Sequence, residues 1–285
     1  MATFHWGPLL QGGPPSNACV DGDLGTLFIG ILNLTPDSFS DGGRFTDPAD
    51  ALAQAHRLMA AGCRILDLGA ESTRPGAVPI VPDEEWRRLE GPLALLRREL
   101  PGVPLSLDTR HAEVAAMGLA AGASVLNDVT GFCDPAMLAL ARASSCGLIA
   151  MRSRSRDGAL VMPDYEGPGE TTADRAVAEL ASLKDRLLDK ELDAERLLLD
   201  PGFGFGTTFG EDLALWEALP ALPGRLSWPA DRICIGLSRK RFLARRAGTP
   251  GLAPAGRDGL TAQAQAQAHG LGYRVFRTHA ATLEG

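Results

Sequence analysis

Oxygen-bearing and small residues directly follow the first strongly apolar segment of the 285-residue chain. Asn33 comes after the apolar run 27–32, and Thr35, Asp37 and Asp41 follow it closely. An apolar run of this length fits a buried strand, and the residues after it fit a turn or loop. Ligands of parallel α/β proteins bind where strands end, so this stretch is a candidate binding loop. An ordinary connecting loop is the alternative.

Polar residues also follow the later apolar runs. They are Asp67, Asp108, Asn127, Asp200, Lys240, Arg277 and His279. Each of them alone is explained as a strand-end cap or a turn former. In a closed barrel they would converge on one rim. There the carboxylates and the amide could pair with the amino and amide edge of a flat heterocycle, while the cations could bind an anion.

Eight apolar segments alternate with helical ones, and no linker separates them. We predict strands at 27–32, 64–68, 103–107, 124–126, 147–151, 196–199, 232–236 and 273–276. We predict helices at 50–61, 82–100, 112–121, 135–144, 171–189, 211–219 and 258–269, and a helix start at Ser238-Arg239-Lys240. This alternation predicts one (β/α)₈ TIM barrel over residues 27–285. A doubly wound open sheet is the alternative.

Three segments stand outside this regular alternation. Residues 1–26 are rich in Gly and Pro, which predicts an irregular or hairpin lead-in. A long loop runs from Arg152 to Gly169, and loops of this length are usually functional or disordered. The final barrel helix is expected after His279, where only six residues remain, so we expect it to be missing. The apolar side chains of the lead-in, or a second subunit, could cover the surface that this helix would hide.

Composition excludes several classes of protein. A net charge of −7 argues against general nucleic-acid binding, which needs a basic face. The five cysteines are scattered and odd in number, as expected for reduced thiols of a cytoplasmic protein. We find no secretory leader and no apolar run long enough to span a membrane. Gly202, Gly204 and Gly206 lack the spacing of a dinucleotide-binding fingerprint.

Six segments resemble, in the same order, the motifs of the dihydropteroate synthase family. They are 33–43 (Asn-Leu-Thr-Pro-Asp-Ser-Phe-Ser-Asp-Gly-Gly), 71–76 (Glu-Ser-Thr-Arg-Pro-Gly), 107–109 (Leu-Asp-Thr), 126–129 (Leu-Asn-Asp-Val), 199–206 (Leu-Asp-Pro-Gly-Phe-Gly-Phe-Gly) and 236–240 (Gly-Leu-Ser-Arg-Lys). The first two motifs and Ser-Arg-Lys are specific, whereas Leu-Asp-Thr alone is weak. The resemblance extends from Leu27 to His279, which is nearly the whole chain.

The resemblance implies a role for each matching residue. Pterin-binding residues would be Asp108, Asn127, Asp200 and Lys240. Pyrophosphate-binding residues would be Asn33, Thr73, Arg74, Arg277 and His279. p-Aminobenzoate would lie near Phe39, Thr73, Pro75, Phe205 and Ser238, and also near Lys240. Lys240, Arg74 and Asp108 would be the catalytic residues.

By the same resemblance, the reaction joins 6-hydroxymethyl-7,8-dihydropterin pyrophosphate to p-aminobenzoate in folate biosynthesis. Asn33 and Asp41 would supply oxygen ligands to Mg²⁺, a cation that usually takes one or two protein oxygens and completes its shell with phosphate and water. The resemblance also favours a homodimer.

The chain departs from the family pattern at two motifs and, most of all, in its missing final helix. Met151-Arg152 stands where the family usually has Met-His, and Arg277-Thr278-His279-Ala280 replaces Arg-Val-His-Asp-Val. Two other functions therefore stay open. A pterin-dependent methyltransferase domain should lack the pyrophosphate grip, so Arg74, Arg277 and His279 speak against it. A non-catalytic pterin-binding paralogue would explain the altered tail.

Overall fold

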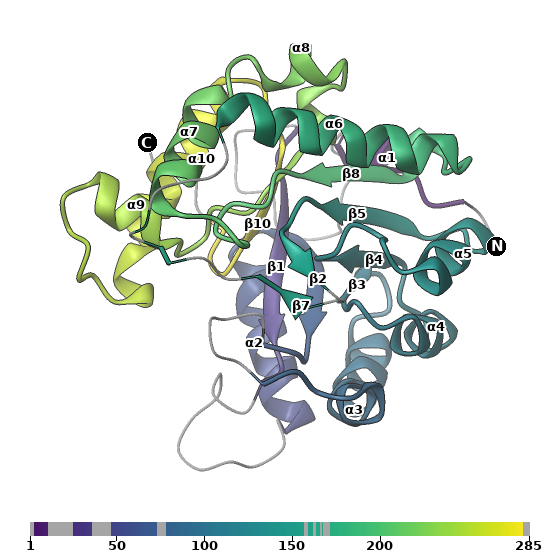
Figure 1. Cartoon of the computed structure of the whole chain (residues 1–285). Coiled ribbons are helices and arrows are strands. Elements are labelled where there is room, and N and C mark those ends of the chain that lie inside the picture. Colours follow the sequence, from purple (N-terminus) through teal and green to yellow (C-terminus); the bar gives the residue numbers. More distant parts are fainter. Residues whose placement is uncertain are drawn as a thin grey trace.

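A computed structural model describes residues 3–10, 25–35, 47–72, 78–156, 159–161, 164, 165, 167 and 172–281. Its main sheet has eight parallel strands in the order β8-β5-β4-β3-β2-β1-β10-β9 (Figure 1). Leu199 of β8 forms a further parallel bridge with Ile233, next to β9. The two edges of the sheet therefore approach each other, and the nearly closed barrel confirms the predicted TIM-barrel class.

All eight predicted strands exist, with ends shifted by at most two residues. They are β1 Leu27–Asn33, β2 Cys63–Gly69, β3 Leu105–Asp108, β4 Val125–Asp128, β5 Gly147–Met151, β8 Leu197–Asp200, β9 Cys234–Ile235 and β10 Val275–Thr278. Within the long loop after β5, β6 (Ser155–Arg156) pairs antiparallel with β7 (Ala159–Leu160). That hairpin was not predicted.

The predicted helices also form. They are α2 Pro48–Ala60, α3 Pro82–Glu99, α4 Ala112–Ala120, α5 Pro135–Ala143, α6 Ala173–Asp189, α7 Phe209–Ala218 and α10 Asp258–Gly270, with α9 Arg241–Arg246 following the Ser-Arg-Lys motif. The short elements α8 (Leu222–Leu226), η2 (Ala194–Arg196), η3 (Ala230–Arg232) and η4 (Pro254–Arg257) were not predicted. Local capping explains several starts: Thr208 and Glu211, for example, form a capping box at α7.

The floor of the barrel is apolar. Inward side chains gather there from the lower parts of the strands: Leu27, Ile29, Ile65, Val125, Ile149, Leu198, Cys234 and Val275. A short helix, α1 (Trp6–Leu10), packs its buried Trp6 and Leu10 against this cluster. Trp6 Nε1 donates a hydrogen bond of 2.7 Å to the backbone oxygen of Arg196. The lead-in is thus not wholly irregular, and its helix closes the floor instead of covering the outside of β1 and β10.

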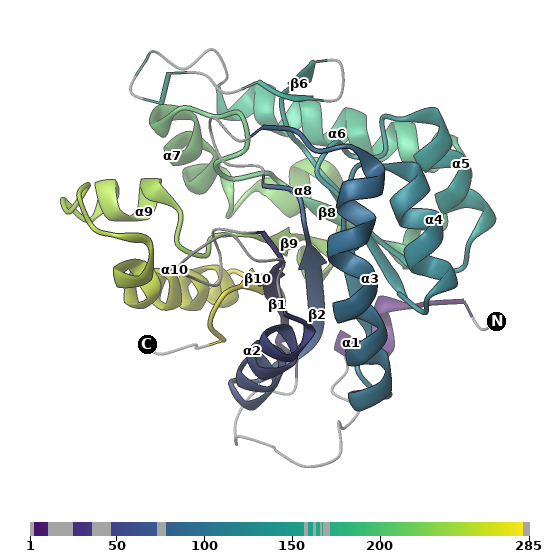
Figure 2. The same ribbon diagram turned by 90° about the horizontal axis from the view of Figure 1, so that it is seen from below.

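A second apolar layer lies between the strands and the surrounding helices. On the outside of β1 and β10, Phe28 and Phe276 lie with ring centroids 5.9 Å apart, and Phe28 is only half-buried. β1 and β10 run between α2 and α10 in Figure 2. The described chain continues only to Ala281 after β10, and those residues form no helix. Among the described helices, none combines the length and apolarity that a membrane span requires.

Candidate active site

The upper part of the same barrel interior is polar. Side chains two residues apart in a strand face the same way, so each apolar floor residue is followed by an inward residue one layer higher. In four strands that higher residue is polar: Ile65 is followed by Asp67, Val125 by Asn127, Leu198 by Asp200 and Val275 by Arg277. The strand register therefore brings these predicted site residues to one end of the barrel.

Arg277 joins two carboxylates that come from different strands. Its Nε donates a hydrogen bond of 2.5 Å to Asp67 Oδ2, and its Nη2 donates to Asp108 Oδ2. Asn127 Nδ2 also donates to Asp67 Oδ2, at 3.0 Å. Asp67 Oδ1 is buried and has no partner among the described residues. The cluster thus contains carboxylate oxygens that can still accept hydrogen bonds.

Burial of these charges shifts their protonation. Burial raises the pKa of Asp108 to about 7. The cation of Arg277 opposes this rise, whereas the negative charges of Asp67, Glu85 and Asp128 add to it. The pKa of Arg277 is raised by Asp67 and Asp108, against the effect of burial, so this side chain stays charged. Asp67 and Asp108 share the single positive charge of Arg277. The surroundings of Asp108 therefore favour an additional N–H donor, such as one from a ligand.

Asp200 and Lys240 form a second part of the site. Asp200 is buried, and its Oδ1 accepts a hydrogen bond of 2.7 Å from the backbone of Gly202. Burial raises the pKa of Asp200 to about 6, although that hydrogen bond and Lys240 oppose the rise. Burial lowers the pKa of Lys240 to about 8, while Asp212 and Asp200 favour its charged form. Lys240 is therefore mainly charged at neutral pH and loses its proton in mild alkali.

Lys240 lies over an aromatic ring that the sequence assigned to p-aminobenzoate. Its Nζ is 3.9 Å from the centroid of Phe205, which is half-buried. Gly204 has a φ of 73°, and a Cβ there would lie 3.1 Å from Lys240 Cδ. The buried Asp212 accepts hydrogen bonds from the backbone of Gly204, at 2.9 Å, and from Thr207 Oγ1, at 2.7 Å. The glycine-rich segment thus lets the chain pass close beside the lysine.

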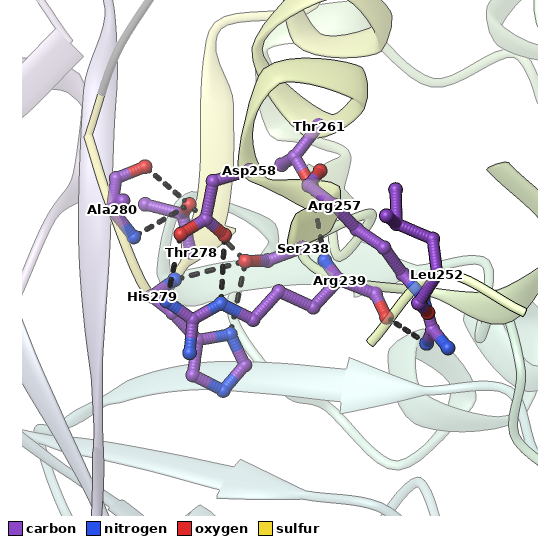
Figure 3. Close-up of polar contacts among 9 residues, drawn as sticks. All are labelled: Ser238, Arg239, Leu252, Arg257, Asp258, Thr261, Thr278, His279 and Ala280. Atoms are coloured by element: carbon purple, nitrogen blue, oxygen red, sulfur yellow. Dashed lines mark hydrogen bonds and ion pairs between the residues drawn. The ribbon is translucent and has the colours of Figure 1, made fainter. Parts of the chain in front are cut away.

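Ser238 and His279 contact each other, although they were predicted to bind different substrates. Ser238 Oγ lies 2.9 Å from His279 Nδ1 and accepts a hydrogen bond of 3.0 Å from the backbone of His279 (Figure 3). The hydroxyl can then donate to Nδ1, which leaves the proton of a neutral imidazole on Nε2. Burial lowers the pKa of His279 to about 3, so the ring is neutral at physiological pH.

The remaining predicted site residues are only partly described. Asn33 ends β1 and is half-buried. The other residues, Phe39, Asp41, Thr73, Arg74 and Pro75, lie outside the described residues. Glu71 lies just before the segment 73–77. It accepts two hydrogen bonds from Arg110 and one of 3.2 Å from the backbone N–H of Ile80. These contacts join the two flanks of the segment 73–77.

Two acids in the site carried no assigned role in the sequence interpretation. Asp67 follows the apolar pair Ile65-Leu66 near the end of β2, and an acid at that place was the available signal. Asp212 lies one turn into α7, where it resembles an ordinary acid near a helix start. The unusual Arg152 is buried, and it donates hydrogen bonds to Glu179, at 2.9 Å, and to the backbone oxygen of Pro201, at 3.2 Å. It therefore supports the loop that follows β8.

Comparisons with known proteins agree with this arrangement. Residues 29–279 match the family model described as pterin binding enzyme. The chain is 38% identical to dihydropteroate synthase of Mycobacterium leprae over 260 residues, which cover 88% of each chain. It is similar to the structure of Xanthomonas albilineans dihydropteroate synthase with 4-aminobenzoic acid, with a TM-score of 0.78 and 32% identity over 90% of this chain and 89% of that one.

A further similar structure is that of Burkholderia cenocepacia dihydropteroate synthase complexed with 7,8-dihydropteroate. Its TM-score is 0.75 and its identity is 35%, over 90% of this chain and 87% of the other. The family model spans the strand ends that carry the described site residues, from Asn33 to His279. The chain belongs to the pterin-binding enzyme family and, within it, to the dihydropteroate synthases.

Proposed function

We propose that the described cluster acts in the synthase reaction, in which 6-hydroxymethyl-7,8-dihydropterin pyrophosphate and p-aminobenzoate give 7,8-dihydropteroate and pyrophosphate. The observation that carries this proposal is the sharing of Arg277 by Asp67 and Asp108 beside Asn127. This cluster offers carboxylate and amide groups to a flat molecule with amino and amide groups along one edge. A pterin is such a molecule.

The pterin ring would lie across the upper layer of the barrel. Asp108 and Asp200 would accept hydrogen bonds from the N–H groups of the ring, which burial of these carboxyls makes more valuable than in water. The amide of Asn127 has an acceptor oxygen and two N–H donors, one of which already holds Asp67. Lys240 would stack on the ring with the methylene chain and reach towards the second substrate.

The anionic end of the pterin substrate would lie where β1 and β10 end. Arg277 Nη1 makes no hydrogen bond to the described residues, so it can still bind a phosphate oxygen. His279 would add a neutral Nε2–H donor, because Ser238 lies at the other ring nitrogen. Thr73 and Arg74 would complete this grip, as the sequence predicts.

The chemistry then requires a C–O bond to break and a C–N bond to form. Pyrophosphate leaves with the bonding electrons, and the cationic side chains stabilise its negative charge. The amine of p-aminobenzoate attacks the methylene carbon, and its extra proton passes to solvent. Lys240 above Phe205 would hold the aromatic acid near that carbon, with Ser238, Phe39 and Pro75 around it. No covalent bond to the enzyme is needed.

We propose Mg²⁺ as the metal of this reaction, held through Asn33 and Asp41. Among the described residues, no three acidic, histidine or cysteine side chains form a metal-binding group, and Asn33 is the described member of the predicted pair. This donor set fits a magnesium ion bound largely by pyrophosphate and water. When bound, Mg²⁺ would neutralise charge on the leaving group.

One coupled assay tests both the reaction and the metal. Pyrophosphate release is followed with both substrates present, then with p-aminobenzoate omitted, and then with excess EDTA. We expect release only with both substrates and metal, and a reduced rate for Asn33→Ala. Pterin binding without any release would instead identify a non-catalytic paralogue. Undiminished release in EDTA would show that the metal role is wrong.

We also propose a homodimer whose interface includes the outer face of β1 and β10. Support comes from Phe28, which is half-buried beside Phe276, and from the position of α1 at the barrel floor, where it does not cover this face. Light scattering at micromolar concentration should give twice the mass of one chain, and Phe28→Glu should weaken the association. A stable wild-type monomer would contradict the proposal.

We propose the cytoplasm as the site of action. The support is chemical: Cys63, Cys133, Cys146 and Cys234 are all free, as thiols are kept in a reducing compartment. Fractionation of cells that express the chain at its natural level is the test. Recovery of the enzyme outside the cytoplasmic fraction would contradict the proposal.

A further inference from the structure

The turn at residues 237–240 carries two site residues that serve different parts of the site. Ser238 contacts His279, whereas Lys240 lies over the ring of Phe205. Arg239, between them, has a φ of 59°, in the left-handed region that glycine adopts far more readily than arginine. A residue with a side chain keeps such a conformation only where its surroundings hold it there.

Residues of η4 and α10 form hydrogen bonds with the backbone and the side chain of Arg239, as Figure 3 shows. Thr261 Oγ1 accepts a hydrogen bond of 3.0 Å from its backbone N–H. Arg257 Nη1 donates one of 2.9 Å to its backbone oxygen. The carboxylate of Asp258 accepts two from its guanidinium, at 2.7 and 2.8 Å. A bidentate pair of this kind fixes the orientation of both partners.

The groups that hold Arg239 are themselves fixed. Thr261 Oγ1 donates a hydrogen bond of 2.9 Å to the backbone oxygen of Arg257, and both residues are buried. Arg257 Nε donates a second one, of 2.8 Å, to the backbone oxygen of Leu252. The left-handed residue is therefore attached to η4 and α10, which contain none of the predicted substrate-binding residues.

We infer that Asp258 is a positioning residue of the synthase site. By holding Arg239 in the left-handed conformation, it directs Ser238 towards His279 and Lys240 towards Phe205. Without the bidentate pair, the turn can relax to a conformation that suits arginine better. Ser238 and Lys240 would then no longer be presented together. The kinetic consequence rests on the proposed function, whereas the geometric consequence does not.

An ordinary structural ion pair is the competing explanation, and the exposure of the pair distinguishes the two. The Asp258 side chain is 36% exposed and that of Arg239 is 30% exposed. Pairs this accessible to water usually contribute little to stability. Loss of the pair should therefore change the melting temperature little, and a large effect on catalysis would have to come from the shape of the turn.

The first test is Asp258→Asn, which keeps the size of the side chain but removes its charge and one acceptor. We expect kcat/KM for p-aminobenzoate to fall about 10- to 100-fold, because small misplacements of site groups cost that much. The matched control is Asp174→Asn, which breaks the exposed 2.8 Å pair between Asp174 and Arg225. The control should keep wild-type kinetics.

The second test compares two replacements of Arg239 itself. Arg239→Ala and Arg239→Gly both remove the guanidinium, but only glycine accepts a positive φ without strain. We expect the alanine variant to lose as much activity as Asp258→Asn and the glycine variant to lose several-fold less. In the glycine background, Asp258→Asn should have no further effect. Equal loss in the alanine and glycine variants would overturn the inference.

A third measurement needs no turnover. In the wild type, ¹⁵N NMR of the imidazoles should show His279 as a fixed Nε2–H tautomer, assigned by comparison with His279→Asn. In Asp258→Asn, the signals of the two ring nitrogens should move towards averaged values. An unchanged tautomer would overturn the inference. Fixed geometry together with no pyrophosphate release by the wild type would instead count against the proposed function.

Discussion

The two layers of the barrel interior differ sharply in chemistry, although the same strands build both. At the floor, residues such as Ile65, Val125 and Val275 form a buried apolar cluster against which Trp6 packs. One layer higher, about 7 Å along each strand, the inward residues of four strands are charged or polar. The floor is formed of fully or almost fully buried apolar side chains. The upper layer leaves carboxylate oxygens without partners among the described residues, such as Asp67 Oδ1. The comparison predicts that changes at the floor affect stability alone, whereas changes in the layer above it also affect catalysis.

The largest effect in the upper layer is expected for Arg277→Met. It leaves Asp67 and Asp108 without their shared cation, and breaking a buried pair in this way costs roughly 3–5 kcal/mol. Loss of charge opposite the leaving group should also reduce kcat by about 10²–10³-fold. Urea unfolding and the pyrophosphate assay measure the two effects. Arg225→Met, at an exposed ion pair, is the control. Full activity in Arg277→Met would show that this cation has no part in the reaction.

At the floor, Trp6→Ala is the corresponding change. Removing a fully buried tryptophan should cost about 3–5 kcal/mol of unfolding free energy. The Michaelis constants should stay unchanged below the new melting temperature, because the floor cluster against which α1 packs contains none of the predicted site residues. Urea unfolding with kinetics at low temperature separates these quantities. A variant that stays stable but loses substrate affinity would contradict the division between the layers.

A milder change in the upper layer is Asp108→Asn. It keeps the shape of the side chain but turns one acceptor into a donor, so a pterin N–H would face a mismatched group. We expect a loss of about 1–3 kcal/mol in pterin binding. Calorimetric titration with a pterin measures this loss, and Asp174→Asn serves again as the control. Equal affinity in both proteins would remove Asp108 from the pterin site.

A smaller effect is expected in how the stabilities of the wild type and Asp108→Asn depend on pH. Burial raises the pKa of Asp108 to about 7, whereas a carboxyl in an unfolded chain titrates near ~4. Between these values the folded protein keeps a proton that the unfolded chain has lost. The contribution of this bound proton to the stability of the folded protein is therefore complete below about pH 4. It is lost as the pH rises through about 7. The melting temperature of the wild type minus that of Asp108→Asn should fall over this range. A constant difference would contradict the shift.

The smallest expected effect concerns the ring beneath Lys240. Phe205→Leu removes a cation–π contact worth about 0.5–1 kcal/mol. The Michaelis constant for p-aminobenzoate should rise about two- to fivefold, with little change in stability. Phe203→Leu is the matched control, because Phe203 is buried and stacks on Phe242 in the core. The control should lose stability and keep its Michaelis constant. The reverse pattern would assign Phe205 to packing alone.

Much of this molecule could be predicted from the sequence, because the informative patterns are local. Apolar runs alternating with amphipathic segments predict the strands, the helices and the barrel. The polar residue after each run predicts which side chains reach the rim, and this prediction holds for Asp108, Asn127, Asp200 and Arg277. The isolated acid within 64–69 also pointed to Asp67, although no role was assigned to it. Helix α8, in contrast, has five residues and includes Pro and Gly, so no periodic pattern could indicate it.

Only the tertiary structure decided which of these residues meet. Arg277 pairs with Asp67, 210 residues away along the chain, because β10, β1 and β2 are neighbours in the closed barrel. Ser238 contacts His279 across 41 residues for a similar reason. The spacing of residues within a strand fixes the face on which a side chain lies, but it carries no information about strand neighbours. The left-handed turn at Arg239 likewise depends on α10, a helix that follows it in sequence and folds back against it.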